Sequence, residues 1–152
     1  LPKTAWPPTS LDLARLDAAA GRCAGGADAL VVEGAGGLLV PFAPGLDLAD
    51  LEARWSLDLV VVAGNRLGVL NHTLLTVREA ARRGRQVRAV ALNALHGGPP
   101  DLAGATIAGA LRGLLGAVPL VTVPHLDGVA QEDPAALAAA GDALARVLLA
   151  PP

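Results

Sequence analysis

Four short runs of apolar residues punctuate the chain, and each is continuous rather than alternating with polar positions. They are rich in valine, leucine and alanine and cover residues 29–33 (ALVVE), 58–63 (DLVVVA), 87–93 (VRAVALN) and 119–123 (PLVTV). Strands that are buried on both faces of a parallel sheet show this pattern, whereas half-exposed strands alternate. The four runs therefore predict four strands of a mostly parallel sheet.

Segments with a helical period lie between and beside these runs. Residues 70–83 place their apolar side chains on one side and charged ones on the other, and Gly84 follows as a C-terminal cap. Residues 134–148 follow Asp133 as the N-cap and begin with a proline, which suits the first helical position. Residues 11–22 and 102–114 have the same period. The alternation predicts a single layered α/β domain over residues 1–152, with right-handed crossovers.

The ends of the predicted strands carry the candidate chemistry. In open α/β sheets, ligands bind beyond the carboxyl ends of the strands. Those ends are the segments 33–37, 64–71, 93–98 and 124–128, which are rich in glycine, asparagine, histidine and acidic residues. The sequence therefore predicts a functional rim formed by these four segments.

Glu33 ends the first run and is followed by Gly-Ala-Gly-Gly. A carboxylate at a strand end is costly to bury unless it binds a cation or enters a hydrogen-bond network. Mg²⁺ bound to phosphates usually takes only one or two carboxylates, and glycines let backbone amides approach an anion closely. The alternative is a tight turn beside a solvated glutamate.

Two further segments of the rim have both a ligand-binding and a local interpretation. Gly68 and Asn71 stand at the start of a predicted helix, where free amides attract a carboxylate or phosphate, although an ordinary capped helix fits as well. His72 is expected to bond within its own loop. Asn93 ends the third strand, and an asparagine amide pairs well with the N6/N7 edge of adenine. A strand-end asparagine is also a common turn residue.

Composition limits the classes of protein that fit. The net charge of −2 gives no electrostatic argument for binding nucleic acid or an anionic membrane. The single cysteine, Cys23, excludes an internal disulfide and fits a reducing cytosol. No apolar run reaches the roughly 18 residues of a membrane-spanning helix, and no signal peptide opens the chain. A soluble cytoplasmic domain is expected.

Taken in order, these segments resemble the dethiobiotin synthetase family. The stretches are LVVEGAGGLLVPF, LDLVVVAGNRLGVLNHTLLTVREAARRG, VRAVALN and VPHLDG, running from about Asp28 to Gly128. The resemblance implies a P-loop NTPase-like fold and a homodimer. It also implies a reaction that depends on ATP and Mg²⁺, in which 7,8-diaminononanoate and carbon dioxide are closed to the cyclic urea of dethiobiotin, with ADP and phosphate as the other products.

The resemblance also assigns roles by position. Glu33 corresponds to a magnesium ligand, and Gly34, Ala35 and Gly36 approach the phosphates of ATP. The base pocket corresponds to Asn93, Ala94, Pro124, His125 and Leu126, with Gln131 as another nucleotide contact. Val69, Leu70 and Asn71 resemble the segment that holds the substrate carboxylate across the dimer interface.

The chain departs from the family at its beginning. Family members open with a glycine-rich phosphate loop that carries Lys and Thr, followed by a catalytic lysine and a metal-binding aspartate. The signature G-x-x-x-x-G-K-[ST] does not occur in this sequence, and Lys3-Thr4 follows Pro2, which has no N–H to offer a phosphate. The chain thus resembles the C-terminal two-thirds of the enzyme, and no catalytic residue is expected within it. A family tyrosine near the substrate tail is also absent between Asn93 and Leu111.

This departure affects both the expected behaviour of the chain and the functions open to it. The chain alone is expected to be inactive and to expose an unpaired, valine-rich sheet edge, so that it associates or dissolves poorly. A non-catalytic dimerisation or regulatory module derived from the same fold is the alternative function. A third possible function is that of a cobyrinate-amidating or ParA-like ATPase, but the pattern GxxNHxLLT argues against it.

Overall fold

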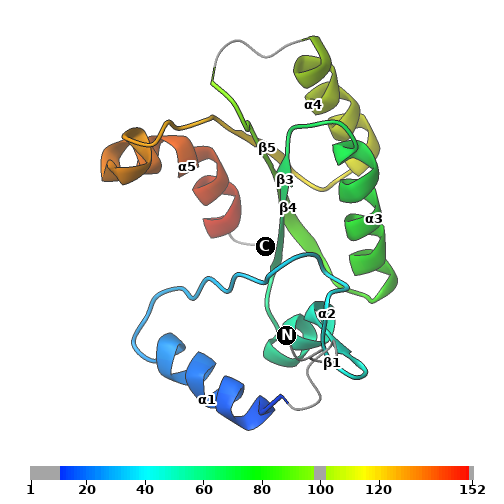
Figure 1. Cartoon of the computed structure of the whole chain (residues 1–152), viewed down its shortest axis with the longest axis vertical. Coiled ribbons are helices and arrows are strands. Elements are labelled where there is room, and N and C mark those ends of the chain that lie inside the picture. The colour runs from blue at the N-terminus through cyan, green and yellow to red at the C-terminus, as the bar shows by residue number, and fades with distance from the viewer. Residues whose placement is uncertain (1–10, 98–101, 151–152) are drawn as a thin grey trace, which may run out of the picture. The chain divides into compact units, whose positions relative to one another are not determined.

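The computed structural model of the chain describes residues 11–97 and 102–150 (Figure 1). By its internal contacts the chain divides into two compact units, Leu1–Leu57 and Asp58–Pro152, and each is described by itself. Among the described residues, no helix combines the length and the apolar character needed to cross a membrane.

The first unit contains two helices and a small hairpin. Helix α1 spans Leu13–Ala24, strands β1 (Pro41–Ala43) and β2 (Leu46–Asp47) pair antiparallel, and helix α2 spans Leu48–Trp55. Asp47 begins α2 through a capping box, in which its side chain accepts from the Asp50 N–H at 3.0 Å and the Asp50 side chain accepts from the Asp47 N–H at 2.9 Å. Such reciprocal bonds satisfy donors that the first turn of a helix leaves free.

An ion pair joins the two helices of this unit. Asp17 of α1 accepts from Arg54 Nε at 2.9 Å and from the Trp55 indole N–H at 2.8 Å, both on α2. These hydrogen bonds, the one from Arg54 first, lower the pKa of Asp17 to about 2. Helix α1 has no fully buried residue, and this polar contact links it to α2.

We expect Asp17→Asn to loosen α1, because an amide loses the charge that faces the Arg54 guanidinium. A carboxyl group whose pKa is lowered stabilises the folded state above its ordinary pKa, and that contribution disappears as the pH falls toward 2. Hydrogen exchange of the α1 amides, corrected for the intrinsic rate, should therefore accelerate between about pH 4 and 2 in the wild type and be fast throughout in the variant. Asp28→Asn, an exposed acid of the same unit, is the control. Unchanged exchange in Asp17→Asn would contradict the assignment.

The second unit is a three-layered α/β fold. Strands β3 (Leu59–Gly64), β4 (Val87–Asn93) and β5 (Leu120–Val123) form a parallel sheet in that order. Figure 1 shows helices α3 (Val69–Arg82) and α4 (Leu102–Leu115) on one side of the sheet and α5 (Pro134–Leu149) on the other. The short helix η1 (Ala130–Glu132) precedes α5.

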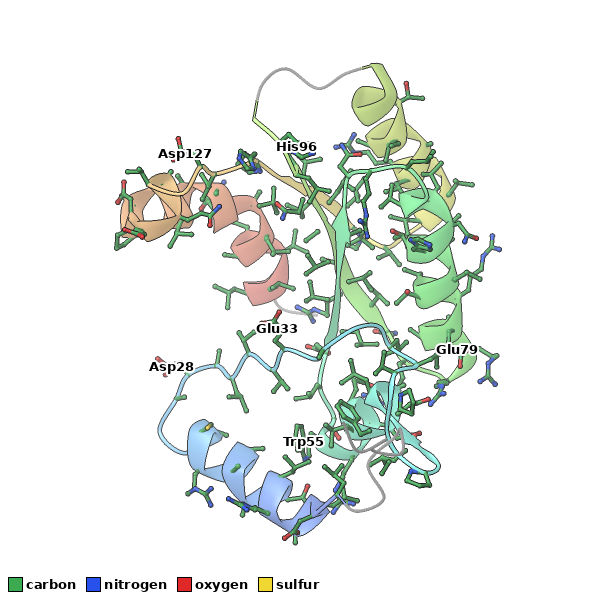
Figure 2. All side chains as sticks on the ribbon, viewed as in Figure 1. Asp28, Glu33, Trp55, Glu79, His96 and Asp127 are labelled. Atoms are coloured by element: carbon green, nitrogen blue, oxygen red, sulfur yellow. The ribbon has the colours of Figure 1, made fainter. Side chains whose placement is uncertain are left out.

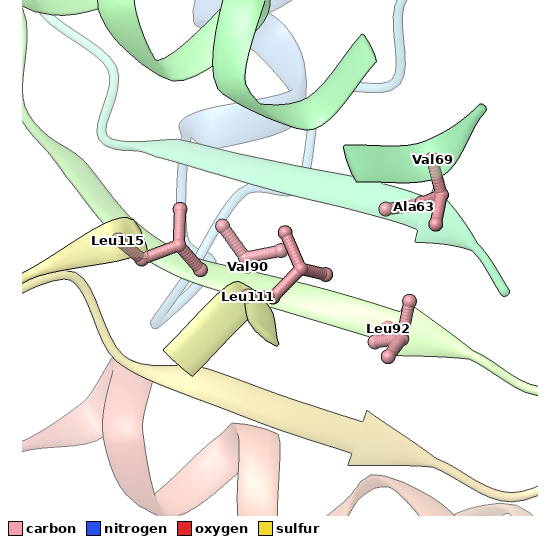
Figure 3. Packing of buried hydrophobic residues seen from close by; sticks show 6 residues of the cluster. All are labelled: Ala63, Val69, Val90, Leu92, Leu111 and Leu115. Carbon is pink, nitrogen blue, oxygen red and sulfur yellow. The ribbon is translucent and has the colours of Figure 1, made fainter. Parts of the chain in front are cut away.

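The core of this unit lies between the sheet and the α3–α4 layer. Leu111 of α4 and Val90 of β4 are both 0% exposed and meet at its centre (Figure 3). The remaining buried members of the cluster are Ala63, Val69, Leu92 and Leu115. With so few aromatic residues available, small and branched aliphatic side chains fill this layer.

Most of the predicted elements are confirmed. The runs 58–63, 87–93 and 119–123 form β3, β4 and β5, and the four predicted helices exist with ends shifted by at most two residues. Gly84 adopts a left-handed φ of 70° just after α3, and Asp133 accepts from the Ala135 N–H at 2.9 Å at the start of α5. An α/β domain with a parallel sheet flanked by helices is therefore correct.

The predicted strand over residues 29–33 is wrong. These residues are extended but belong to no strand, and Val31 is 91% exposed. An apolar run satisfies the pattern of a strand, but a strand exists only when a second segment pairs with its backbone. Among the described residues, the structure pairs no segment with this run. Glu33 accordingly does not end a buried strand.

Candidate functional site

In the parallel sheet of the second unit, the predicted rim segments lie together at the carboxyl ends of the strands. The Cα partners at the strand ends are Gly64 with Asn93, and Asn93 with Val123. The ladder continues one residue further, since the Asn65 N–H donates to the Asn93 carbonyl at 2.8 Å and the Ala94 N–H to the Val123 carbonyl at 2.9 Å. The loops that follow β3, β4 and β5 therefore leave the sheet together.

Asn93 lies at the centre of this edge, on the middle strand. Leu92 points into the core beneath α3 and α4, so its neighbour Asn93 faces the opposite layer, where α5 lies. Asn93 is half-buried. Among the described residues no hydrogen-bond partner is found for its side-chain amide, which keeps both a donor and an acceptor for a ligand.

The loop after β5 is fixed by its own hydrogen bonds. The Asp127 side chain accepts from the Ala130 N–H at 2.9 Å, and the Gln131 amide nitrogen donates to the Leu126 carbonyl at 2.7 Å (Figure 2 labels Asp127). His125 is exposed, and its Cδ2 would lie 3.4 Å from a Cβ built on Gly97. The loops after β4 and β5 thus pack against each other, and the amide nitrogen of Gln131 serves the loop itself.

The first turn of α3 has free backbone donors. Gly68 is its N-cap with a left-handed φ of 92°, and no side chain caps the helix. The His72 N–H donates to the Gly68 carbonyl at 3.1 Å, and the His72 ring packs beside Gly68. Among the described residues, the N–H groups of Leu70 and Asn71 have no backbone acceptor. Free amides at a helix N-terminus attract an anion, and His72 belongs to the local packing.

The segment with Glu33 belongs to the first unit. Glu33 is exposed, and the glycines after it have reasons of their own in the fold. A Cβ on Gly34 would collide with the Leu48 side chain, and Gly36 has a φ of 86°, where a Cβ would also lie 2.6 Å from Val40 Cγ2. Gly36 is therefore required by its backbone conformation, whatever it binds, and a side chain at Gly34 would force the Leu48 side chain to move.

A resident metal cluster is not seen in the described ranges. Within residues 11–97 and 102–150, no group of three or more His, Cys, Asp or Glu side chains could hold an ion. A single exposed carboxylate such as Glu33 fits Mg²⁺ only as one ligand, with the remaining positions filled by phosphate oxygens and water.

Two buried oxygens were not anticipated from the sequence. Asn65 Oδ1 and Thr73 Oγ1 are inaccessible to solvent and have no hydrogen-bond partner among the described residues. Thr73 is 2% exposed within α3, and Asn65 directly follows β3. Asn65 could have been recognised by its place after a strand, whereas nothing in the helical pattern distinguishes Thr73.

The chain is similar in sequence to known proteins. A model of an AAA domain family matches residues 8–132. The chain is 38% identical to the ATP-dependent dethiobiotin synthetase BioD of Aromatoleum aromaticum over 129 residues, which are 85% of this chain and 55% of the relative. It is 48% identical to the BioD of Rhizorhabdus wittichii over 79 residues, which are 52% of this chain and 36% of that relative.

A third relative gives a similar result. The BioD of Anaeromyxobacter dehalogenans is 47% identical over 91 residues, which are 60% of this chain and 40% of the relative. The chain thus spans between 36% and 55% of the length of these three curated relatives. The resemblance inferred from the sequence is confirmed.

Proposed function

The chain belongs to the AAA domain family, and we propose that it supplies the adenine-binding and substrate-carboxylate-binding parts of an ATP-dependent dethiobiotin synthetase. The observation that carries the proposal is the meeting of the loops after β4 and β5 at the carboxyl edge of the sheet. The relatives named above are ATP-dependent enzymes, and their similarity supports the use of ATP here. The proposed reaction forms carbon–nitrogen bonds in biotin biosynthesis. We also propose a cytoplasmic location, which the single cysteine, Cys23, supports.

The adenine base is assigned to the loops after β4 and β5. Asn93 offers a donor and an acceptor side by side, which match N7 and the N6 amino group of adenine. Ala94 follows it, and Pro124, His125 and Leu126 supply apolar and aromatic surface for the ring. Gln131 is a further proposed contact, through its side-chain oxygen, because its amide nitrogen is engaged by Leu126.

The phosphates and Mg²⁺ are assigned to the first unit. Glu33 would provide one carboxylate ligand, and the segment Gly34 to Gly36 would present backbone amides to phosphate oxygens. Bound Mg²⁺ supplies charge neutralisation on the phosphates. The carboxylate of Glu33 and the small side chains after it are this chain's own contribution.

The start of α3 is assigned to the organic substrate. The N–H groups of Leu70 and Asn71, at the positive end of the helix dipole, suit the carboxylate of 7,8-diaminononanoate, with Val69 opening the turn. We propose that this helix end serves the neighbouring subunit of a homodimer. Carbon dioxide is the proposed source of the ring carbonyl, and dethiobiotin, ADP and phosphate are the products.

A second candidate is a non-catalytic dimerisation or regulatory module with the same fold. This candidate predicts nucleotide binding that is weak or absent and no turnover in any context, which separates it from the enzyme.

The test supplies the phosphate loop from a relative. The chain is fused behind the N-terminal segment of the Aromatoleum aromaticum enzyme that precedes the matched region, and dethiobiotin is measured with ATP, Mg²⁺, 7,8-diaminononanoate and bicarbonate. We expect the fusion to form dethiobiotin and the chain alone to form none. A folded fusion that forms none, beside an active relative, would favour the module.

Glu33→Gln in the active fusion should lower Mg²⁺-dependent turnover at least about tenfold, a loss of about 1.4 kcal/mol or more. The amide keeps the shape of the side chain but removes the charge that would bind the cation. Asp28→Asn changes another exposed acid on the same segment (Figure 2) and should leave turnover unchanged. If the dependence of turnover on Mg²⁺ is the same in Glu33→Gln and in the parent, Glu33 is not a ligand.

A further inference from the structure

Gly64 and Asn93 lie side by side at the carboxyl ends of β3 and β4, where they are Cα partners in the parallel ladder. The residues before them, Ala63 and Leu92, both belong to the buried cluster beneath α3 and α4 (Figure 3). Side chains alternate between the two faces of a strand. The side chain of Asn93 and the Cβ direction of Gly64 therefore point to the same, opposite face of the sheet, against which α5 packs.

The side chain of Leu95 fills the space that a side chain at Gly64 would need. A Cβ built on Gly64 would lie 3.2 Å from Leu95 Cδ2 and 3.3 Å from Leu95 Cδ1, which is tighter than most Cβ contacts in proteins. Gly64 does not have a positive φ, so its backbone conformation is open to other residues and the contact with Leu95 is what favours glycine. Leu95 is 37% exposed, so part of its surface is free to meet a ligand.

Leu95 therefore stands beside Asn93 on the β3 side. On the other side, Val123 of β5 is the Cα partner of Asn93. Neighbouring strands lie about 4.8 Å apart, so Asn93 stands between the Leu95 side chain and the end of β5. A base whose edge bonds to the Asn93 amide has a flat face toward each of these neighbours, and Leu95 is placed to cover one of the two faces.

We propose that Leu95 is a specificity-determining residue of the base site, which favours a purine over a pyrimidine by contact with the flat face of the ring. The inference rests on the proposed function, because it takes Asn93 as the residue that binds the edge of the base. An amide recognises the edge by hydrogen bonds, whereas an isobutyl group stabilises the ring in proportion to the apolar area it covers. A purine has the larger face, so Leu95 favours it.

Gly64 is the positioning residue for Leu95. The Asn65 N–H donates to the Asn93 carbonyl at 2.8 Å and holds the end of β3 against β4. A methyl group on Gly64 would therefore shift the Leu95 side chain by a few tenths of an ångström rather than part the two strands. Gly64→Ala thus disturbs Leu95 without changing a group that is proposed to touch the base.

The test uses the full chain and three nucleosides, which probe the base site without phosphates, and dissociation constants are measured by ligand-observed NMR titration. Adenosine and cytidine both present an amino group beside a ring nitrogen and differ in ring size, whereas inosine keeps the purine and replaces the amino group by an oxygen. Leu95→Ala should weaken adenosine binding at least about threefold and cytidine binding less, because more covered area is lost with the purine. The ratio of adenosine to inosine affinity should stay unchanged.

Three variants serve as comparisons. Asn93→Ala should show the reverse pattern, in which the preference for adenosine over inosine is lost and that for adenosine over cytidine is kept. Leu95→Met keeps an apolar side chain of similar volume and should bind adenosine like the parent. Leu114→Ala makes the same truncation at a 53% exposed leucine on α4 and should alter none of the affinities.

Gly64→Ala tests the seating of Leu95 and is a second variant should Leu95→Ala not fold, as judged by circular dichroism. It should also weaken adenosine binding, and it should add nothing in the double variant with Leu95→Ala, because the space above Gly64 is then open. If both single variants keep the parent's ratio of adenosine to cytidine affinity, the inference is overturned and the proposed function stands. A parent chain that binds none of the three nucleosides would overturn the proposed base site, and this inference with it.

Discussion

Leu111→Ala is expected to lower the free energy of unfolding of the Asp58–Pro152 unit by about 2–5 kcal/mol. Leu111 is 0% exposed and lies at the centre of the cluster between the sheet and α4 (Figure 3). Truncation removes buried methyl groups and leaves a cavity that the rigid sheet cannot fill. Chemical denaturation followed by circular dichroism gives the change as a shift in the midpoint.

The same helix provides the control for this prediction. Leu114 is 53% exposed on α4, so Leu114→Ala should change the free energy of unfolding by only about 0.5 kcal/mol, as at other surface positions. Both substitutions alter helix propensity identically, and their difference therefore isolates burial. Similar midpoints for the two variants would mean that Leu111 is not central to the core.

Asn93→Asp is expected to weaken ATP binding by about 1–3 kcal/mol in the active fusion protein. The amide donor that would pair with N7 of adenine becomes a charged acceptor, so two acceptors face each other. Titration calorimetry measures the loss directly. Because Asn93 lies at the carboxyl end of β4 and is only half-buried, the carboxylate remains solvated in the free protein and the fold should survive.

A matched change at the other end of the same strand separates base recognition from charge. Gln86→Glu also turns an amide into a carboxylate, at an exposed residue just before β4. It should leave ATP affinity unaltered. Equal ATP affinity for Asn93→Asp and the parent would remove Asn93 from the base pocket, and an equal loss in both variants would point to a general effect of charge.

Predictions from local sequence patterns were correct where the hydrogen bonds that fix an element lie within that element. Helix α5 begins at Asp133 and Pro134 as predicted, because the cap bonds lie within the first turn. Helix α2 was missed although Asp47 and Asp50 form a capping box, since its eight residues are too few for a helical period to stand out. The β1–β2 hairpin was also missed, because its strands are too short to show a pattern.

The candidate site could be predicted in part. Asn93 was selected because it ends a predicted strand, and Pro124 and His125 because they follow one, and the parallel register brings the ends of those strands together. Glu33 was selected by the same rule, but its run forms no strand among the described residues. The roles of all these residues stay predictions. Asn65 could have been selected by its place after a strand, but the sequence could not show that its oxygen and that of Thr73 lack a partner among the described residues, since burial of a single polar atom depends on the packing around it.

The sequence by itself determined the α/β class, three parallel strands, the limits of four helices and the family resemblance, because apolar runs, caps and motifs are properties of neighbouring residues. The tertiary structure decided the strand order of the β3–β4–β5 sheet, the face of that sheet on which its helices pack and the conformation of residues 29–33. These features depend on which segments pair across long stretches of chain. An apolar run such as ALVVE or LVVVAG indicates that a segment favours burial. Only a second segment that pairs with its backbone makes it a strand.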